Sequence, residues 1–109
     1  MRLAREPFGM IASGRKTVEV RLFDEKRARL SVGDTIEFTC TDSGERITVR
    51  ITDLMRFSSF SELYSSGLLD DCGCGGMTVE EAVSYILRYY TVSDEAKYGA
   101  LAVRFEVMS

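Results

Sequence analysis

Four segments of this sequence alternate apolar and polar side chains with a period of two residues, at residues 17–23, 35–41, 46–51 and 100–107. In an extended strand, this period places the apolar side chains on one face and the polar side chains on the other. The segments are separated by turn signals, such as the glycine and aspartate at positions 33 and 34. The chain is therefore expected to build a sheet with one apolar face.

Helix signals lie between these segments. Pro7 predicts the first position of a short helix that Gly14 ends in the left-handed conformation. Capping-box patterns begin at Ser59 and Thr78, and the second opens the clearest amphipathic helix, which runs towards residue 90 and should pack on the sheet. Ser93 is expected to cap one more helical turn. The element order is a helix, three strands, two or three helices and a final strand.

This order, with the chain length, predicts the fold class. A chain of 109 residues removes about two-thirds of its unfolded surface from water, which is enough for one core. We expect a single domain over residues 1–109 with an α+β fold, in which a small, mostly antiparallel sheet curls into a partly closed barrel with flanking helices. Closure would remove exposed strand edges. The simplest topology pairs consecutive strands, and the C-terminal strand must pair back with the early ones.

Residues 13–21, SGRKTVEVR, hold a dense group of charged side chains: Arg15, Lys16, Glu19 and Arg21. The strand period puts Glu19 and Arg21 on one face. The chain has a net charge of −3, but residues 1–29 carry eight basic and four acidic side chains. A local basic patch on an acidic body favours a small or single-stranded anionic ligand over a long duplex. The alternative is an ordinary solvated surface.

Three cysteines, Cys40, Cys72 and Cys74, make an odd count and argue against a disulfide framework. The chain has no histidine, so a zinc site at Cys72 and Cys74 would have to use carboxylates such as Asp70 or Asp71. We prefer a glycine-rich turn and expect neither a metal nor a cofactor. Neither a membrane-spanning segment nor a signal peptide is visible, which predicts a cytoplasmic protein.

Three tyrosines lie in the second half of the long predicted helix, namely Tyr85, Tyr89 and Tyr90. Aromatic side chains on a surface can stack on nucleobases. Tyrosines on an amphipathic helix more often pack at the core or its rim. The sequence leaves both interpretations open.

Several segments together resemble the ASCH domain family of the PUA-like superfamily. They are EPFGMIASGRKTVEVRL, VGDTIEF, the helix that ends in YY, and KYGALAV, and the resemblance covers about residues 3–107. Its most specific part is a G-x-K-T-x-E-x-R pattern formed by Gly14, Lys16, Thr17, Glu19 and Arg21, followed by Gly33 and Asp34. The resemblance implies a PUA-like β-barrel with flanking helices, RNA binding, and a ligand cleft beside the G-x-K strand.

Some proteins similar to this family hydrolyse acylated cytidine, and ribonuclease activity is attributed to others. The amidohydrolase chemistry uses the motif lysine, a threonine three residues later and a downstream glutamate. Lys16 fits this pattern, but Glu19 stands in place of the threonine, and no glutamate precedes Met77 in the glycine-rich segment. Thr17 falls on the strand face opposite to Lys16. These departures weaken the amidohydrolase interpretation.

Two functions follow as hypotheses. The first is a module that binds single-stranded RNA or a nucleotide or nucleoside, with a lysine and an arginine holding a phosphate and a glutamate accepting from an amine or a hydroxyl group. The second is a small hydrolase of RNA or acylated (deoxy)cytidine-type nucleosides, with Glu19 as the base and Lys16 in the active site. A third possibility is a ladder of ion pairs with no ligand. The residues expected at the ligand are Arg5, Arg15, Lys16, Thr17, Glu19 and Arg21.

Overall fold

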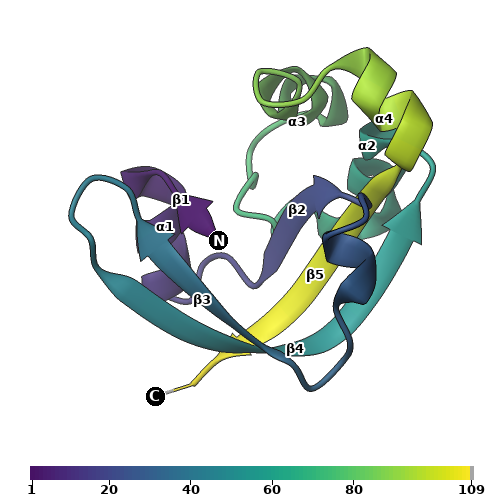
Figure 1. The fold of residues 1–109 in the computed structure, drawn as a ribbon. Helices are drawn as coiled ribbons and strands as arrows, with labels where there is room; N and C mark the ends of the chain where they lie inside the picture. The colour runs from purple at the N-terminus through teal and green to yellow at the C-terminus, as the bar shows by residue number, and fades with distance from the viewer. Residues whose placement is uncertain (109) are drawn as a thin grey trace.

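The computed structural model describes residues 1–108, which form five strands, four α-helices, a 3₁₀-helix and a π-helical turn (Figure 1). In chain order these are β1 (Arg2–Leu3), α1 (Arg5–Ala12), β2 (Val18–Leu22), η1 (Arg27–Arg29), β3 (Thr35–Cys40), β4 (Arg46–Phe57), α2 (Phe60–Leu63), η2 (Tyr64–Leu68), α3 (Val79–Ile86), α4 (Val92–Tyr98) and β5 (Ala100–Val107). Within the described residues, no helix is long and apolar enough to cross a bilayer.

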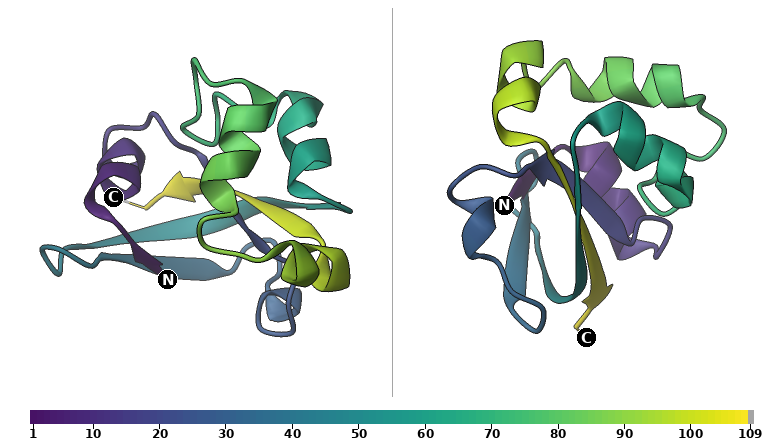
Figure 2. Two further views of the ribbon diagram at one scale, coloured as in Figure 1. Left: turned by 90° about the horizontal axis from the view of Figure 1, so that it is seen from above. Right: turned by 90° about the vertical axis from the view of Figure 1, so that its right-hand side faces the viewer.

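The strands form one mixed sheet in the order β1-β3-β4-β5-β2. Three of the four pairings are antiparallel, and β1 runs parallel to β3. The sheet curls into a half-barrel, and α2, α3 and α4 gather on one side of it, whereas α1 lies beside β1 and β3 (Figure 1, Figure 2). The expected α+β class, with a mostly antiparallel and partly closed sheet, is confirmed.

The predicted pairing of consecutive strands is correct for β3 and β4 and wrong for β2, which pairs with β5. A hairpin requires a short connection. Residues 23–34 instead form a longer connection that contains η1 and carries the chain to the other part of the sheet. The C-terminal strand pairs back with early strands as expected, because β5 lies between β4 and β2.

Two clusters of buried apolar side chains lie on the two faces of the sheet. One contains Phe38, Ile51 and Val103 and is covered by α1 through Phe8. The other joins alternate residues of β2 and β5 to α2, η2 and α3. Strand β5 contributes to both clusters because successive side chains point to opposite faces. Strand β5, which lies between β4 and β2, therefore holds the two layers together.

Two predicted helix starts differ from the structure. Helix α1 begins at Arg5, so Pro7 is its third residue and not its first. Proline is tolerated there because the first N–H groups of a helix have no partner within it. The last helix is capped by Thr91, whose hydroxyl accepts from the Asp94 amide at 3.0 Å, and not by Ser93.

The two capping residues and the glycine that ends α1 agree with the structure. Ser59 and Thr78 both cap their helices, but the reciprocal bond of the predicted capping box is present only at Thr78, since the Glu62 carboxylate accepts from the Ser58 hydroxyl group instead. Gly14 has the predicted positive φ of 80°.

Helix α3 ends at Ile86, earlier than expected, and packs on α2 and η2 as well as on the cluster that contains β2. Ile86, at the end of α3, lines the same cavities as Glu19 and Val20 of β2.

Candidate functional site

Two adjoining cavities of about 240 Å³ and about 120 Å³ open between the N-terminal segment and α3. We call them together the β2 cleft. The side chains that line both cavities are Pro7, Lys16, Glu19, Val20, Tyr85 and Ile86. The larger cavity adds residues of β1 with Arg21, Tyr89 and Tyr90, and the smaller one adds Met10, Tyr64, Cys72, Cys74 and Met77.

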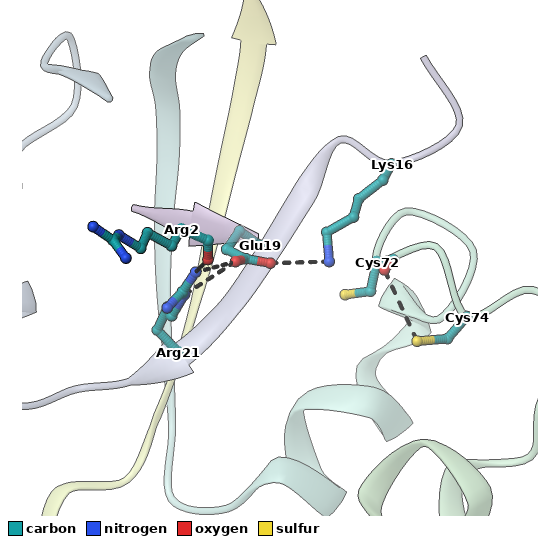
Figure 3. Close-up of polar contacts among 6 residues, drawn as sticks. All are labelled: Arg2, Lys16, Glu19, Arg21, Cys72 and Cys74. Atoms are coloured by element: carbon teal, nitrogen blue, oxygen red, sulfur yellow. Dashed lines mark hydrogen bonds and ion pairs between the residues drawn. The ribbon is translucent and has the colours of Figure 1, made fainter. Parts of the chain in front are cut away.

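The floor of the β2 cleft is a group of three charged side chains (Figure 3). Lys16 Nζ lies 2.9 Å from Glu19 Oε1. On the other side of the carboxylate, Arg21 donates from Nη2 and Nε to Glu19 Oε2 at 2.8 and 3.0 Å. Only 6% of the Glu19 side chain is exposed, against 11% for Lys16 and 15% for Arg21. We call this group the Lys16–Glu19–Arg21 triad.

The local sequence explains why the triad forms. The left-handed Gly14 turns the chain back after α1, so that the Lys16 amide donates to the Met10 carbonyl at 3.1 Å and β2 begins directly afterwards. Alternation along β2 then places Glu19 and Arg21 on one face. Their partners on β5 are Val103 and Leu101, both buried. The charged side chains of Glu19 and Arg21 therefore lie on an otherwise apolar face of the sheet. Their ion pairs offset the free-energy cost of burying them.

Arg21 also connects two parts of the sheet that are distant in its strand order. Its Nη2 donates to the main-chain carbonyl oxygen of Arg2 at 3.2 Å. Arg2 lies in β1 and Arg21 in β2, and these are the two edge strands of the half-barrel. The guanidinium group thus spans the opening of the half-barrel beside the cleft.

The ion pairs determine the charge states of the triad. Burial raises the pKa of Glu19, but Lys16 and Arg21 together outweigh burial and hold this pKa below its usual range. Burial lowers the pKa of Arg21, and the Glu19 carboxylate, with a contribution from Tyr90, raises it above the usual value. Two cations therefore share one anion, and the floor of the cleft carries a net charge of about +1.

The lysine retains hydrogen-bonding capacity. An ammonium group has three donors, and among the described residues Glu19 is the one polar partner of Lys16 Nζ. Lys16 lines both cavities. Its remaining donors are therefore available to an acceptor that enters the cleft.

The glycine-rich segment from residue 70 to residue 76 forms one wall of the smaller cavity. It is a turn in which the Asp71 carbonyl oxygen accepts from the amides of Thr17 and Val18 at 2.8 and 3.0 Å. Cys72 is buried, and burial raises its pKa to about 12 against the opposing effect of Lys16. Burial also raises the pKa of Cys74. Both thiols are therefore protonated at neutral pH and are weak nucleophiles.

No metal site is apparent at these thiols. In residues 1–108, no three cysteine, aspartate or glutamate side chains come close enough together to hold a metal ion. All three cysteines are free thiols.

The remaining residues expected at the ligand lie outside the cleft. Arg5 is exposed, with Nε 3.8 Å from an Asp42 carboxylate oxygen. Arg15 is exposed and donates from Nε to the Ser13 hydroxyl oxygen at 3.1 Å. Thr17 lines neither cavity. Of the six residues expected at the ligand, the structure thus brings Lys16, Glu19 and Arg21 together in the cleft and leaves the other three outside it.

Several residues of the cleft have no signal in the sequence that places them there, and one of these is Arg2, which lines the larger cavity. It belongs to β1, and a strand of two residues is too short to show any periodicity. Pro7 was identified only as a helix-start residue. Its position on the cleft wall follows from the placement of α1 and has no local signal.

Comparisons with known proteins identify the family of the chain and agree with its fold. The family model of the ASCH domain matches residues 1–109. The crystal structure of hypothetical protein PH0355 superimposes with a TM-score of 0.89 at 31% identity, covering 99% of this chain and 96% of that one. The solution structure of protein PF0455 from Pyrococcus furiosus gives 0.76 at 30% identity, covering 100% and 99%. No curated protein sequence matches the chain.

A more distant likeness concerns the fold alone. The crystal structure of protein EF3133 from Enterococcus faecalis V583 superimposes with a TM-score of 0.67 at 15% identity, covering 91% of this chain and 64% of that one. The half-barrel with its flanking helices is therefore shared beyond the range of close sequence similarity.

Proposed function

Because this chain belongs to the ASCH domain family, we propose that it binds a nucleotide, free or within single-stranded RNA, in the β2 cleft. The observation that carries the proposal is the convergence of Lys16, Glu19 and Arg21 on the floor of an open cleft. A triad with one surplus positive charge attracts an anionic ligand. The free donors of Lys16 suit a phosphate or base carbonyl oxygen.

The size and walls of the cleft favour a single nucleotide unit. The larger cavity measures about 240 Å³, which is slightly below the roughly 300–1,000 Å³ typical of sites for drug-sized ligands. Its apolar walls include Leu3, Pro7 and Ile86. One base fits such a space, whereas a run of stacked bases does not. RNA would therefore present one unstacked nucleotide to the cleft.

The same geometry argues for binding over hydrolysis. A general base is most effective when its pKa lies near the working pH. Both oxygens of Glu19 are engaged by cations, and its pKa is lowered. The nearby thiols of Cys72 and Cys74 have raised pKa values, so they supply no thiolate nucleophile at neutral pH. The hydrolase hypothesis therefore has no activated base or nucleophile in this cleft.

Removing the lysine tests the proposal. We expect Lys16→Ala to weaken binding of short, fluorescently labelled single-stranded RNA by about tenfold or more, because a hydrogen bond to a charged group contributes about 1.5–3 kcal/mol. Fluorescence anisotropy at several salt concentrations measures the affinity. The fold should survive, since Glu19 remains paired with Arg21.

A matched control is Arg29→Ala, which removes the same charge from an exposed position in η1 outside the β2 cleft. This variant should bind as the unmodified protein does, apart from a small long-range effect that salt screens. Equal losses in the two variants would contradict a site at Lys16. Absence of binding to RNA and to all four ribonucleotides would refute the proposed function.

A further inference from the structure

Two exposed tyrosines stand at the mouth of the β2 cleft. Tyr85 lies in α3 and lines both cavities, and Tyr89 lies in the following turn and lines the larger one. Their side chains are among the large apolar groups that the fold leaves exposed, at 37% and 61%. Their ring centroids are 5.8 Å apart with an interplanar angle of 61°. They thus form an aromatic wall of two rings set edge to face beside the charged floor, so that a base lying parallel to one ring meets the other at an angle.

These two rings are not used by the core. The buried face of α3 is formed by Ala82, with Val83 and Ile86 packed against the cluster around β2. Tyr90, by contrast, stacks on Phe60 with centroids 5.8 Å apart and an interplanar angle of 21°. The Tyr90 ring therefore packs on the core, whereas Tyr85 and Tyr89 expose aromatic surface to the cleft.

The opposite wall of the larger cavity is also apolar. It is formed by Leu3, Ala4 and Pro7 at the junction of β1 and α1. A planar ring that enters the cavity would lie between this wall and the tyrosines, with its edge directed to the triad on the floor. A flat aromatic group with polar edge atoms can pack its faces against both walls and direct its edge atoms to the charged floor. A nucleobase is such a group.

Charges around the cleft fix the orientation of this ligand. Arg2 and Arg21 line the larger cavity, and the Arg88 guanidinium lies 5.6 Å from the centre of the Tyr85 ring. The smaller cavity carries a carboxylate, Glu6, at its rim. A phosphate is therefore favoured at the end of the cleft near Arg2 and disfavoured at the end near Glu6.

From these contacts we propose that Tyr85 and Tyr89 form a stacking wall for the base of the bound nucleotide, so that the cleft selects ligands that carry a base over bare sugar phosphates. This inference rests on the proposed function and adds the contact that recognises the base of the ligand. In this arrangement Lys16 donates to the edge of the base or to the phosphate, and the stacking wall contacts the plane of the base.

Titrations with the four ribonucleoside 5′-monophosphates and with ribose 5-phosphate test the inference by isothermal calorimetry. The intact protein should bind at least one nucleotide more tightly than ribose 5-phosphate. Tyr85→Ala and Tyr89→Ala should each weaken nucleotide binding by roughly 5- to 150-fold, the range observed when a stacking aromatic is removed. Tyr85→Phe keeps the ring and should bind as the intact protein does.

The outcomes separate the two proposals. If Lys16→Ala weakens nucleotide binding while Tyr85→Ala and Tyr89→Ala do not, the stacking wall is wrong and the nucleotide site stands. Equal affinity of the intact protein for ribose 5-phosphate and for every nucleotide would also refute the stacking wall. If no nucleotide and no RNA binds, both proposals are refuted.

A second measurement needs no variant, in case Tyr85→Ala fails to fold. A base that stacks on the tyrosines shifts their ring proton resonances upfield, and ribose 5-phosphate does not. The resonances of Tyr98, which lines neither cavity of the β2 cleft, serve as an internal control. Nucleotide binding without a selective shift of the Tyr85 and Tyr89 resonances would overturn the inference.

Discussion

Glu19 sets the net charge of the cleft floor, because its carboxylate pairs with two cations, Lys16 and Arg21. It is the one buried acidic residue in the described part of the chain. Glu19 is the anion that both cations share, so its removal leaves two buried cations without compensation, and breaking a buried ion pair in this way typically costs about 3–5 kcal/mol. We therefore expect Glu19→Gln to lower the free energy of unfolding by about this amount at neutral pH. Urea denaturation monitored by circular dichroism measures it.

The pH dependence of this loss identifies its cause. Because the folded-state pKa of Glu19 lies below its ordinary value of 4.5, the ionised carboxylate stabilises the fold above that ordinary value, and this contribution is lost as the pH falls through the folded-state pKa. The difference in stability between the intact protein and Glu19→Gln should therefore be largest at neutral pH and shrink in acid. A difference that does not change with pH would contradict an ionic origin.

A control carboxylate is available on the surface. Glu37 lies 3.9 Å from Arg46 with 53% of its side chain exposed. Exposed pairs contribute about 0–1 kcal/mol, so Glu37→Gln should hardly change the stability. The contrast between Glu19→Gln and Glu37→Gln separates a buried ionic group from an ordinary surface pair.

At the scale of the elements, the glycine-rich turn at residues 70–76 sets the shape of the smaller cavity. Gly73 and Gly76 both have positive φ angles, 78° and 85°. A β-carbon at Gly73 would lie 2.8 Å from Met10 Sδ, whereas at Gly76 it would meet nothing within 4 Å. Met10 and Gly73 both line the smaller cavity.

This difference gives a paired prediction. Gly73→Ala and Gly76→Ala should each cost about 1–2 kcal/mol of stability, because both place an L-residue in the left-handed region. Only Gly73→Ala should displace Met10, seen as a shift of its methyl resonance, and thereby alter ligand affinity. If Gly76→Ala changes the Met10 resonance and the affinity as much as Gly73→Ala does, the turn does not shape the cavity through this contact.

Local patterns predicted most of the elements but not how they meet. The alternation in residues 17–23 was sufficient to place Glu19 and Arg21 on one face, and both capping-box patterns mark real helix starts. Nothing local shows that β2 pairs with β5, and the cleft depends on that pairing. The tyrosines were visible on the helix, but their place at the cleft mouth follows from packing of α3 on α2 and η2.

For the molecule as a whole, the half-barrel leaves β1 and β2 as its two edges. Edge strands carry unpaired main-chain groups, and proteins usually cover or bridge them. Here Arg21 bridges the edges, since it pairs with Glu19 in its own strand and donates to the Arg2 carbonyl oxygen in the other. The triad therefore joins the two sides of the opening as well as forming the floor of the cleft.

Arg21→Lys tests this bridge, because lysine keeps the charge but lacks the planar fork that reaches both partners. Strand β1 should then open more often. We expect faster hydrogen exchange at the amides of Thr39 and Thr41, which donate to carbonyl oxygens of the first three residues at 2.8 and 2.9 Å, and little change in the β4–β5 pairing. Arg46→Lys, in an exposed ion pair, should leave exchange at both amides unchanged. Unaltered exchange in Arg21→Lys would mean that β1 is held by its pairing with β3 alone.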